Sequence, residues 1–479
     1  MGNLKDINYG VGKYLTADDA TSIPDIENNR VNLDTLNFKL ASNNSYALYN
    51  MKDGFIEAFE DTSGVDASAS TNETRDSSGK YYSGYSTSAT NATGGTITTS
   101  GGNTIHTFST ANNGTSTNDF VAPSTETVNY LMVGGGGGGG SGYAGGGGGG
   151  GVITGTTSVN SGTHAVVAGA GGNGDIYGGS NDAQDGGDTT FNSITAYGGG
   201  YGAKSQGTGN SSPASGGGGS DASGPSIDND YGTGGAQGNN GGGGSGNVGG
   251  GGGGAGGAGS NGSYSPSAGG NGGAGVAASI PGVPSATYGG GGGGGTGTTG
   301  PGGSGGSGGG GAGGSGSPDQ VGGDGTDGLG GGGGGSGYSG GVSAPTRSGG
   351  DGGDGTVKIS YTTNAFTETN YLNCTLVSNA QTAQAQPDTA RITVFEHPST
   401  GTTTINTDIK AYASRDNGTT YTQITLADDG EYESGKKLLS GSADISGQPA
   451  GTSMRYKIET LNQSSSKITR LHGVSLQWA

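Results

Sequence analysis

Long runs of glycine interrupt this chain between Gly134 and Gly355, a region called the glycine block below. The uninterrupted runs are Gly134 to Gly140, Gly145 to Gly151, Gly249 to Gly254 and Gly289 to Gly295. Because glycine has no side chain, such runs carry no apolar surface whose burial could drive folding. The glycine block is therefore either a flexible linker or a structure held together by backbone hydrogen bonds. The second alternative fits polyproline-II-like helices with about 3 residues per turn, whose outward N–H and C=O groups can bond to neighbouring helices.

Composition places any hydrophobic core toward the two ends of the chain. The 479 residues include 119 Gly but only 13 Pro, and no strict third-residue period appears, which excludes collagen. Apolar residues gather in the N-terminal part, near residues 120–133, and after Thr356. We therefore expect small folded modules on both sides of the glycine block.

Charge and cysteine content exclude several kinds of partner. The formal net charge is −19 and no basic stripe is present, which predicts that the chain does not bind nucleic acid. The single cysteine, Cys374, lies in an apolar run and predicts a buried, reduced thiol. No apolar run approaches the roughly 20 residues that span a bilayer, and the first residues do not resemble a signal peptide. We expect a protein that is made in the cytoplasm and has no membrane span.

Residues 1–75 are interpreted as an N-terminal attachment and oligomerisation segment. Apolar residues recur at helical spacing at Leu48, Met51, Phe55, Ile56 and Phe59. This spacing predicts a short amphipathic helix, which would need to dock on another chain or module to be stable. Ser, Thr, Asn and Gly then dominate, and residues 76–100 are assigned to a linker.

Two β-prone segments flank the glycine block. Residues 128–133 run directly into the first glycine run, and residues 356–361 alternate apolar and polar side chains after the last. Pairing of these segments would clamp the block, so we predict one glycine-rich domain over residues 101–361. The tyrosines inside the block are not needed in a pure linker. We interpret the glycine runs as packed polyglycine-II helices joined by loops, with a disordered Gly/Ser tract as the alternative.

Residues 362–479 predict an all-β C-terminal module. The candidate strands are 372–377, 391–395, 408–414, 420–426, 454–461 and 474–478. Asn417-Gly418 predicts a tight hairpin turn, because these residues favour positive φ angles. Val474, Leu476 and Trp478 share one strand face, as do Met454, Tyr456 and Ile458, which predicts a β-sandwich. The predicted fold class is thus mainly β with a polyglycine-II helical block.

Several of these segments resemble known phage proteins. The segment 129–133 followed by glycines, together with 352–359 (Gly-Gly-Asp-Gly-Thr-Val-Lys-Ile), resembles the glycine-rich domains of bacteriophage tail-fibre proteins and adhesins. The segments 49–61 and 413–418, with the Trp478 ending, are similar to modules in virion proteins of marine tailed phages. The resemblance implies a virion-associated fibre or adhesin. In T-even-type phage adhesins, loops that join packed polyglycine-II helices contact the host surface. Here the block is internal, so the C-terminal module is an alternative distal tip.

Tyrosines of the glycine block are the candidate receptor-binding residues, because an amphipathic ring loses little entropy on binding and can stack on sugar or protein. They are Tyr143, Tyr177, Tyr197, Tyr201, Tyr231, Tyr264, Tyr288 and Tyr338. Packing against the sides of the glycine helices is their alternative role.

Asp324 and Asp327 form a candidate calcium site. They lie in the run 322–330, which fits the nonapeptide of calcium-binding β-rolls, although an isolated copy cannot complete an ion site. The four histidines are dispersed without zinc-ligand spacing, and no catalytic or cofactor motif stands out. We therefore expect no enzymatic activity and no cofactor.

The functional hypothesis is a phage fibre or adhesin, exposed on the virion surface and homo-oligomeric, with a trimer favoured. Its expected partners are other virion proteins, through the N-terminal segment, and a host-surface glycan or outer-membrane protein. One alternative is a decorating fibre or spacer without a receptor. An ice-binding or cell-surface glycine-rich protein is another, and a glycan-cleaving fibre would require paired carboxylates in a groove.

Overall fold

The computed structural model describes residues 25–110, 119–178, 182–205, 207–221, 230–297, 300–338 and 348–479. It is mainly β, with one helix, α3 (Asp25–Asn43), in the described part of the chain. The chain divides into two compact units. The terminal unit combines the described residues up to Ser88 with Thr369–Ala479, and the glycine-rich unit is Ala89–Glu368.

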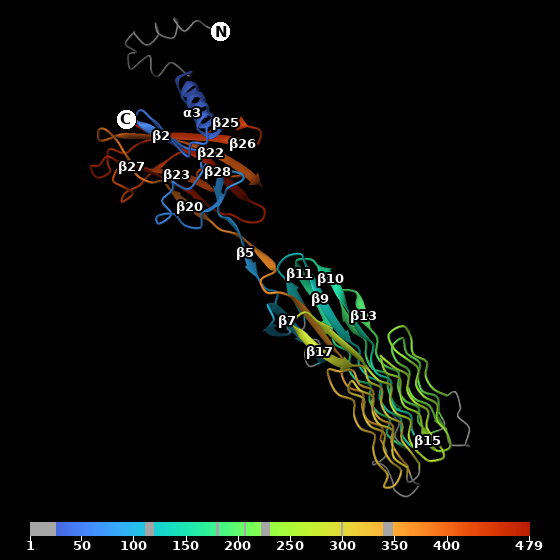
Figure 1. Ribbon diagram of the computed structural model, residues 1–479. Helices are drawn as coiled ribbons and strands as arrows, with labels where there is room; N and C mark the ends of the chain where they lie inside the picture. The colour runs from blue at the N-terminus through green and yellow to red at the C-terminus, as the bar shows by residue number, and fades with distance from the viewer. Residues whose placement is uncertain are drawn as a thin grey trace, which may run out of the picture. The chain divides into compact units, whose positions relative to one another are not determined.

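The terminal unit contains two antiparallel sheets (Figure 1). The strands of the larger sheet are β1 (Leu48–Met51), β2 (Gly54–Glu57), β3 (Thr74–Asp76), β4 (Tyr81–Ser83), β22 (Thr389–Thr400), β25 (Ala427–Glu433), β26 (Lys436–Asp444) and β28 (Ile468–Trp478). Its main order is β1-β2-β28-β22-β26-β25, and β4 joins β3 to β28. The strands of the smaller sheet are β20 (Cys374–Val377), β21 (Gln381–Thr382), β23 (Ile409–Ser414), β24 (Thr422–Ile424) and β27 (Ser453–Thr460).

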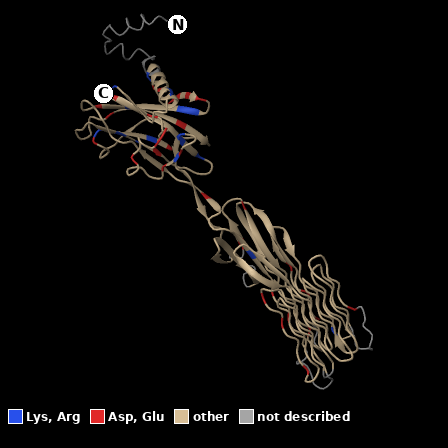
Figure 2. Cartoon of the chain, in the orientation of Figure 1, with Lys and Arg blue, Asp and Glu red and all other residues tan. Residues whose placement is uncertain are grey.

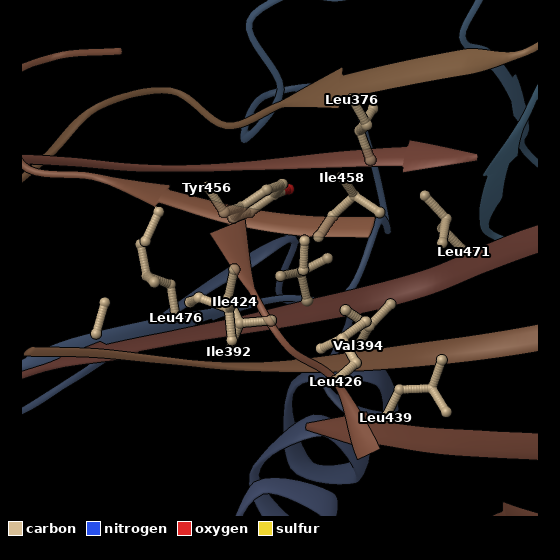
Figure 3. Close-up of a cluster of buried hydrophobic side chains, with 14 of the residues drawn as sticks. Leu376, Ile392, Val394, Ile424, Leu426, Leu439, Tyr456, Ile458, Leu471 and Leu476 are labelled. Carbon is tan, nitrogen blue, oxygen red and sulfur yellow. The ribbon is translucent and has the colours of Figure 1, made fainter. Parts of the chain in front are cut away.

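One cluster of buried side chains is shared by both sheets. Alternate residues of β27 are buried, among them Tyr456 and Ile458, as the period of a strand requires. From the larger sheet, Ile392 and Leu476 enter the same cluster, and Figure 3 shows these side chains pointing toward one another. Cys374 is a free, buried thiol in this core, which confirms the prediction made for it.

The helix predicted over residues 48–59 is wrong. These residues form the hairpin β1–β2, in which Asp53 has a φ of 57° beside Gly54. All four residues of β2 are buried because β2 is an interior strand that pairs with β28. Tertiary pairing therefore overrides a spacing that fits a helix equally well. The helix lies earlier in the chain, and the residues assigned to a linker contain β4, β5 (Tyr85–Thr90) and β6 (Thr96–Ser100).

The first part of the chain is thus not an independent segment. Its strands belong to the same sheet as β22 and β28 from the C-terminal part. The chain leaves the terminal unit in β5 and re-enters it in β19 (Phe366–Tyr371). These two strands pair with each other. The boundaries at residues 75, 100 and 361 therefore differ from the division that the structure shows.

The glycine-rich unit begins and ends in strands. A five-stranded sheet has the order β10-β9-β18-β7-β6, and a four-stranded sheet has the order β13-β12-β11-β8. Their bounds, besides β6, are β7 (Asn103–Phe108), β8 (Asp119–Ala122), β9 (Glu126–Val133), β10 (Val152–Val159), β11 (Gly162–Val167), β12 (Thr189–Phe191), β13 (Ile194–Ala196) and β18 (Thr356–Thr362). Two-stranded pairs are β14 (Ser220–Asp221) with β15 (Val248–Gly249) and β16 (Val276–Ile280) with β17 (Val283–Tyr288). The predicted clamp is present, since β9 pairs with β18 from Val133↔Thr356 onward.

Backbone hydrogen bonds between extended glycine-rich segments hold the glycine block together. The segment 134–140 donates from every third N–H to one neighbour: Gly134, Gly137 and Gly140 bond to the segment 145–151 at 2.9–3.0 Å. Its other N–H groups bond to the segments 184–188 and 349–355, and its carbonyls accept from 169–175, 197–203 and 330–337. Each face of the segment is thus bonded to a different neighbour. The closeness is possible only for glycine, since a Cβ on Gly136 would lie 2.0 Å from the Gly331 carbonyl oxygen.

Successive glycine-rich segments run away from the strands and back again (Figure 1). The turns farthest from the five-stranded and four-stranded sheets form what we call the loop end, which includes residues 141–144, 244–247 and 263–268. Asp175 and Ser336 bond to the carbonyls of Gly139 and Gly140, so Tyr177 and Tyr338 also lie at the loop end. Figure 2 shows that charged residues are sparse among these segments.

Candidate binding surface

Short polar side chains fasten the turn 141–144 at the loop end. Gly142 and Tyr143 have φ angles of 70° and 58°, which reverse the chain between two glycine-rich segments. The Ser141 hydroxyl donates to the buried Asp175 carboxylate at 2.5 Å, and the Gly142 N–H donates to the Ser336 hydroxyl at 2.9 Å. These bonds fix the position from which the Tyr143 side chain leaves the turn.

Three of the predicted tyrosines meet at the loop end. The rings of Tyr143 and Tyr338 pack edge to face with centroids 5.0 Å apart. Tyr177 stacks on Tyr338 with centroids 5.6 Å apart and an interplanar angle of 26°. All three rings are half-buried, so each packs against its neighbours and also presents surface to solvent. Residues up to about 195 positions apart in sequence thus form one aromatic patch.

A groove of about 520 Å³ lies beside this aromatic patch. Its lining includes the carboxylates Asp182, Asp324 and Asp351, the amides of Asn173 and Gln184, and the exposed aliphatic side chains Ile176 and Val321. A smaller cavity, lined by Tyr177, shares Ile176 and Asp182 with the groove. Carboxylate and amide groups can exchange hydrogen bonds with hydroxyl groups of a ligand. Asp182 forms an ion pair with Lys204, so Asp324 and Asp351 give the groove its net negative charge, which disfavours an anionic ligand.

Aspartates at the margin of the block also accept hydrogen bonds from backbone N–H groups. Asp324 accepts from the Asp351 N–H at 2.9 Å, and Asp351 accepts from the Gly174 N–H at 2.7 Å. Three residues further on, Asp327 accepts from the Asp354 N–H at 3.0 Å. The three-residue spacing matches the three-residue repeat of the backbone bonds. At the margin of the block no further glycine-rich segment offers a carbonyl to these N–H groups. Each carboxylate accepts the hydrogen bond in place of that carbonyl.

This role weakens the calcium interpretation of Asp324 and Asp327. One oxygen of each is already used by a backbone N–H. In the described ranges no group of three or more His, Cys, Asp or Glu side chains is placed to hold a metal ion. The structure therefore does not bring the two aspartates together with further ligands.

The remaining predicted tyrosines are dispersed over the block. Tyr264 is 52% exposed in the turn 263–268, and Tyr201 lines a small cavity with Lys204. Tyr231 is half-buried, whereas the exposed Tyr197 directly follows β13, at the end of the block near the strands.

Burial corrects the prediction made for Tyr288. Its side chain is 1% exposed and packs in a core with Leu131 and Val133, so it cannot contact a ligand at the surface. Its place at the end of β17 makes it part of the strand core.

Sequence reasoning missed the groove, because its lining comes from four separate segments of the block. One signal was available in the sequence. Asp185 and Asp188, Asp324 and Asp327, and Asp351 and Asp354 all have i, i+3 spacing. This spacing matches the three-residue repeat of the backbone hydrogen bonds in the block.

Comparison with known proteins identifies the middle of the chain. Residues 110–362, more than half of the chain, match a family model described as a glycine-rich domain. No curated protein and no solved structure matches the chain. None of the helical residues in the described ranges forms a stretch long and apolar enough to cross a bilayer.

Proposed function

The chain belongs to the glycine-rich domain family, and we propose that it is an adhesive fibre protein on the surface of a bacteriophage particle. The virion setting comes from the resemblance of the segments 129–133, 352–359, 49–61 and 413–418 to phage proteins. The family match itself concerns only the glycine-rich domain and carries no information about a virion. In this proposal the terminal unit attaches the chain to other virion proteins, and the loop end faces the host.

In this proposal the extended segments of the glycine block are polyglycine-II helices, and the terminal unit is a β-sandwich. The first assignment is supported by the three-residue period of the backbone bonds and by the six neighbours of the segment 134–140. The shared core of the two sheets supports the second. A solid block matters for adhesion, because loops on a rigid support lose little entropy when they bind.

The aromatic patch carries the adhesive role. Tyr143, Tyr177 and Tyr338 converge from distant parts of the chain beside a groove with hydrogen-bonding groups. Stacking surfaces next to carboxylates and amides suit a sugar, which has apolar ring faces and hydroxyl edges. We therefore propose a host-surface glycan as the ligand, with an outer-membrane protein as the second candidate.

We expect labelled protein to bind susceptible bacterial cells saturably, and the variant Tyr177→Ala/Tyr338→Ala to bind about tenfold or more weakly. Two rings near the centre of a contact surface contribute more than about 1.4 kcal/mol, which corresponds to that factor. The matched control is Tyr197→Ala, which removes an exposed tyrosine of the same block at its other end. Affinity is measured by titration of cells, and thermal unfolding establishes that each variant is folded.

Two results would contradict the proposal. Absence of saturable binding to any cells of a broad bacterial panel would favour the spacer. Equal losses in the Tyr197→Ala and Tyr177→Ala/Tyr338→Ala variants would show that the aromatic patch is not the contact surface.

A further inference from the structure

Helix α3 has an inner face, which the terminal unit buries, and an outer face, which is exposed. On the inner face, Phe38 stacks on Phe395 with centroids 4.0 Å apart. The fully buried Asp34 forms an ion pair with Arg391 and accepts a hydrogen bond from the Thr393 hydroxyl at 2.8 Å. The helix is therefore held rigidly on the sheet that contains β22.

The outer face of α3 carries a stripe of exposed leucines. Leu33, Leu36 and Leu40 are 54%, 63% and 43% exposed. Their spacing of three and then four residues places them along one side of the helix, away from Asp34 and Phe38. Leucines so exposed along one line mark an interaction surface, whereas single exposed apolar residues are ordinary.

The pattern of the stripe fits further copies of the same helix. Apolar residues that recur at alternating intervals of three and four are typical of coiled coils. There, side chains of one helix pack into the spaces between side chains of a neighbouring parallel helix. Extending the same repeat brings in Asn29 and Asn43, both exposed. An amide has both donors and an acceptor, so each asparagine can bond to its own counterpart in a copy that lies in register. None of these five residues carries a charge that would repel an identical stripe, although the chain as a whole has a net charge of −19.

We propose that α3 is a self-association helix, in which Leu33, Leu36 and Leu40 pack against the same residues of further copies of this chain, parallel and in register. The helix has 19 residues and is about 28 Å long, so one stripe offers only about 300 Å² per chain. That is well below the roughly 800 Å² per partner of a stable pair. A bundle in which each helix contacts two neighbours uses more of this surface, which favours three copies. The inference stands whatever the glycine block binds.

The test is the mass of the full chain in solution at about 50 µM, measured by sedimentation equilibrium. We expect a multiple of the 45.7 kDa chain mass, and monomer for the variant Leu33→Asp/Leu36→Asp. Because both positions are exposed, this variant should still fold. Its far-ultraviolet spectrum should match that of the wild type, and its unfolding temperature should be that of a folded, monomeric terminal unit. Leu372→Asp, at another exposed leucine, is the matched control and should leave the assembly intact.

A cysteine variant tests the register. Under mild oxidation Leu36→Cys should form disulfide-linked pairs, because copies in register bring position 36 together, whereas Asn32→Cys on the flank should not. The native Cys374 is buried and does not interfere. A monomeric wild-type chain at 50 µM would overturn the proposal. So would an assembly that persists in Leu33→Asp/Leu36→Asp, since another surface would then hold it.

Discussion

Replacing Gly147 by Ala should destabilise the glycine-rich unit by about 3 kcal/mol or more, as expected for overpacking of a site that cannot expand. A Cβ at this position would lie 2.1 Å from the Gly137 carbonyl oxygen and 2.6 Å from its carbon. These are backbone atoms of a neighbouring segment, so no side-chain rotation relieves the clash. The Gly147 N–H also bonds to Gly333 at 2.8 Å, and its carbonyl accepts from Gly292 at 2.8 Å, so the segment cannot move aside.

The matched control is Gly257→Ala in the same block. Its Cβ would meet nothing nearer than the Ala274 nitrogen at 3.6 Å, which is an ordinary contact. Both substitutions reduce the entropy of the unfolded chain, so the control should be neutral or slightly stabilised while Gly147→Ala is destabilised. Calorimetry should show the unfolding temperature of the glycine-rich unit falling by about 6–12 °C in Gly147→Ala alone. Similar unfolding temperatures for the two variants would show that the segments are not closely packed.

The strands of both units could be predicted from local sequence where apolar alternation is regular. The strands β9 and β18 and their pairing follow from residues 128–133 and 356–361, which border the glycine runs. Asn417 and Gly418 have positive φ and lie between the paired strands β23 and β24, but seven residues join these strands, so the connection is longer than the tight hairpin predicted. At both places the local signal, a strand-like run of apolar residues or a turn-forming Asn-Gly pair, agrees with the tertiary structure.

The N-terminal elements could not be predicted in the same way. The residues Leu48 to Phe59 fit a helix by spacing, and only pairing of β2 with β28, more than 400 positions away, decides for a strand. Helix α3 went unpredicted because its inner face is centred on Asp34 and its outer leucines face solvent. Without the partner Arg391, a charged residue in the middle of a buried helix face is not an apolar signal.

Three of the eight candidate tyrosines form the aromatic patch. The sequence could not show that Tyr143, Tyr177 and Tyr338 meet while Tyr288 enters a core. Their meeting depends on the order in which the glycine-rich segments pack. Backbone bonds set this order, and glycine runs of nearly identical sequence carry little information about which neighbours they choose.

The stability that Glu57 contributes to the terminal unit should fall as pH rises from about 5 to 8. Glu57 is fully buried on β2, and its carboxyl accepts a hydrogen bond from the Tyr456 hydroxyl. Burial, opposed by this bond and assisted by the nearby Asp61 charge, raises the pKa of Glu57 from 4.5 to about 8. Gly64 packs closely against this carboxyl group, since a Cβ at position 64 would lie 2.2 Å from one of its oxygens. The folded protein therefore keeps a proton that the unfolded chain has lost.

The direction of the pH effect follows from these two pKa values. The stability that the protonated Glu57 contributes is complete below pH 4.5 and is lost as pH rises toward 8. Each unit of pH costs up to about 1.4 kcal/mol, or roughly 3–5 kcal/mol over the whole window. Glu396, whose pKa burial raises to about 7, adds to the same trend. Burial lowers the pKa of His472 to about 4, so this histidine opposes the trend between about pH 4 and 6.5. Urea unfolding at pH 5, 7 and 9, followed by fluorescence of the single tryptophan, Trp478, measures the terminal unit because Trp478 packs against its core.

The variant Glu57→Gln isolates this contribution, since its amide oxygen can accept the same bond from Tyr456 and carries no charge at any pH. The free-energy difference between wild type and Glu57→Gln should shift against the wild type as pH rises from 5 to 8, and then level off. Glu396→Gln serves as the matched control, with a smaller shift that ends near pH 7. A difference that stays constant from pH 5 to 9 would mean that Glu57 is ionised in the folded protein. The hairpin β1–β2 would then have to hold a buried charge against the C-terminal strands, which the apolar surroundings of β2 make unfavourable.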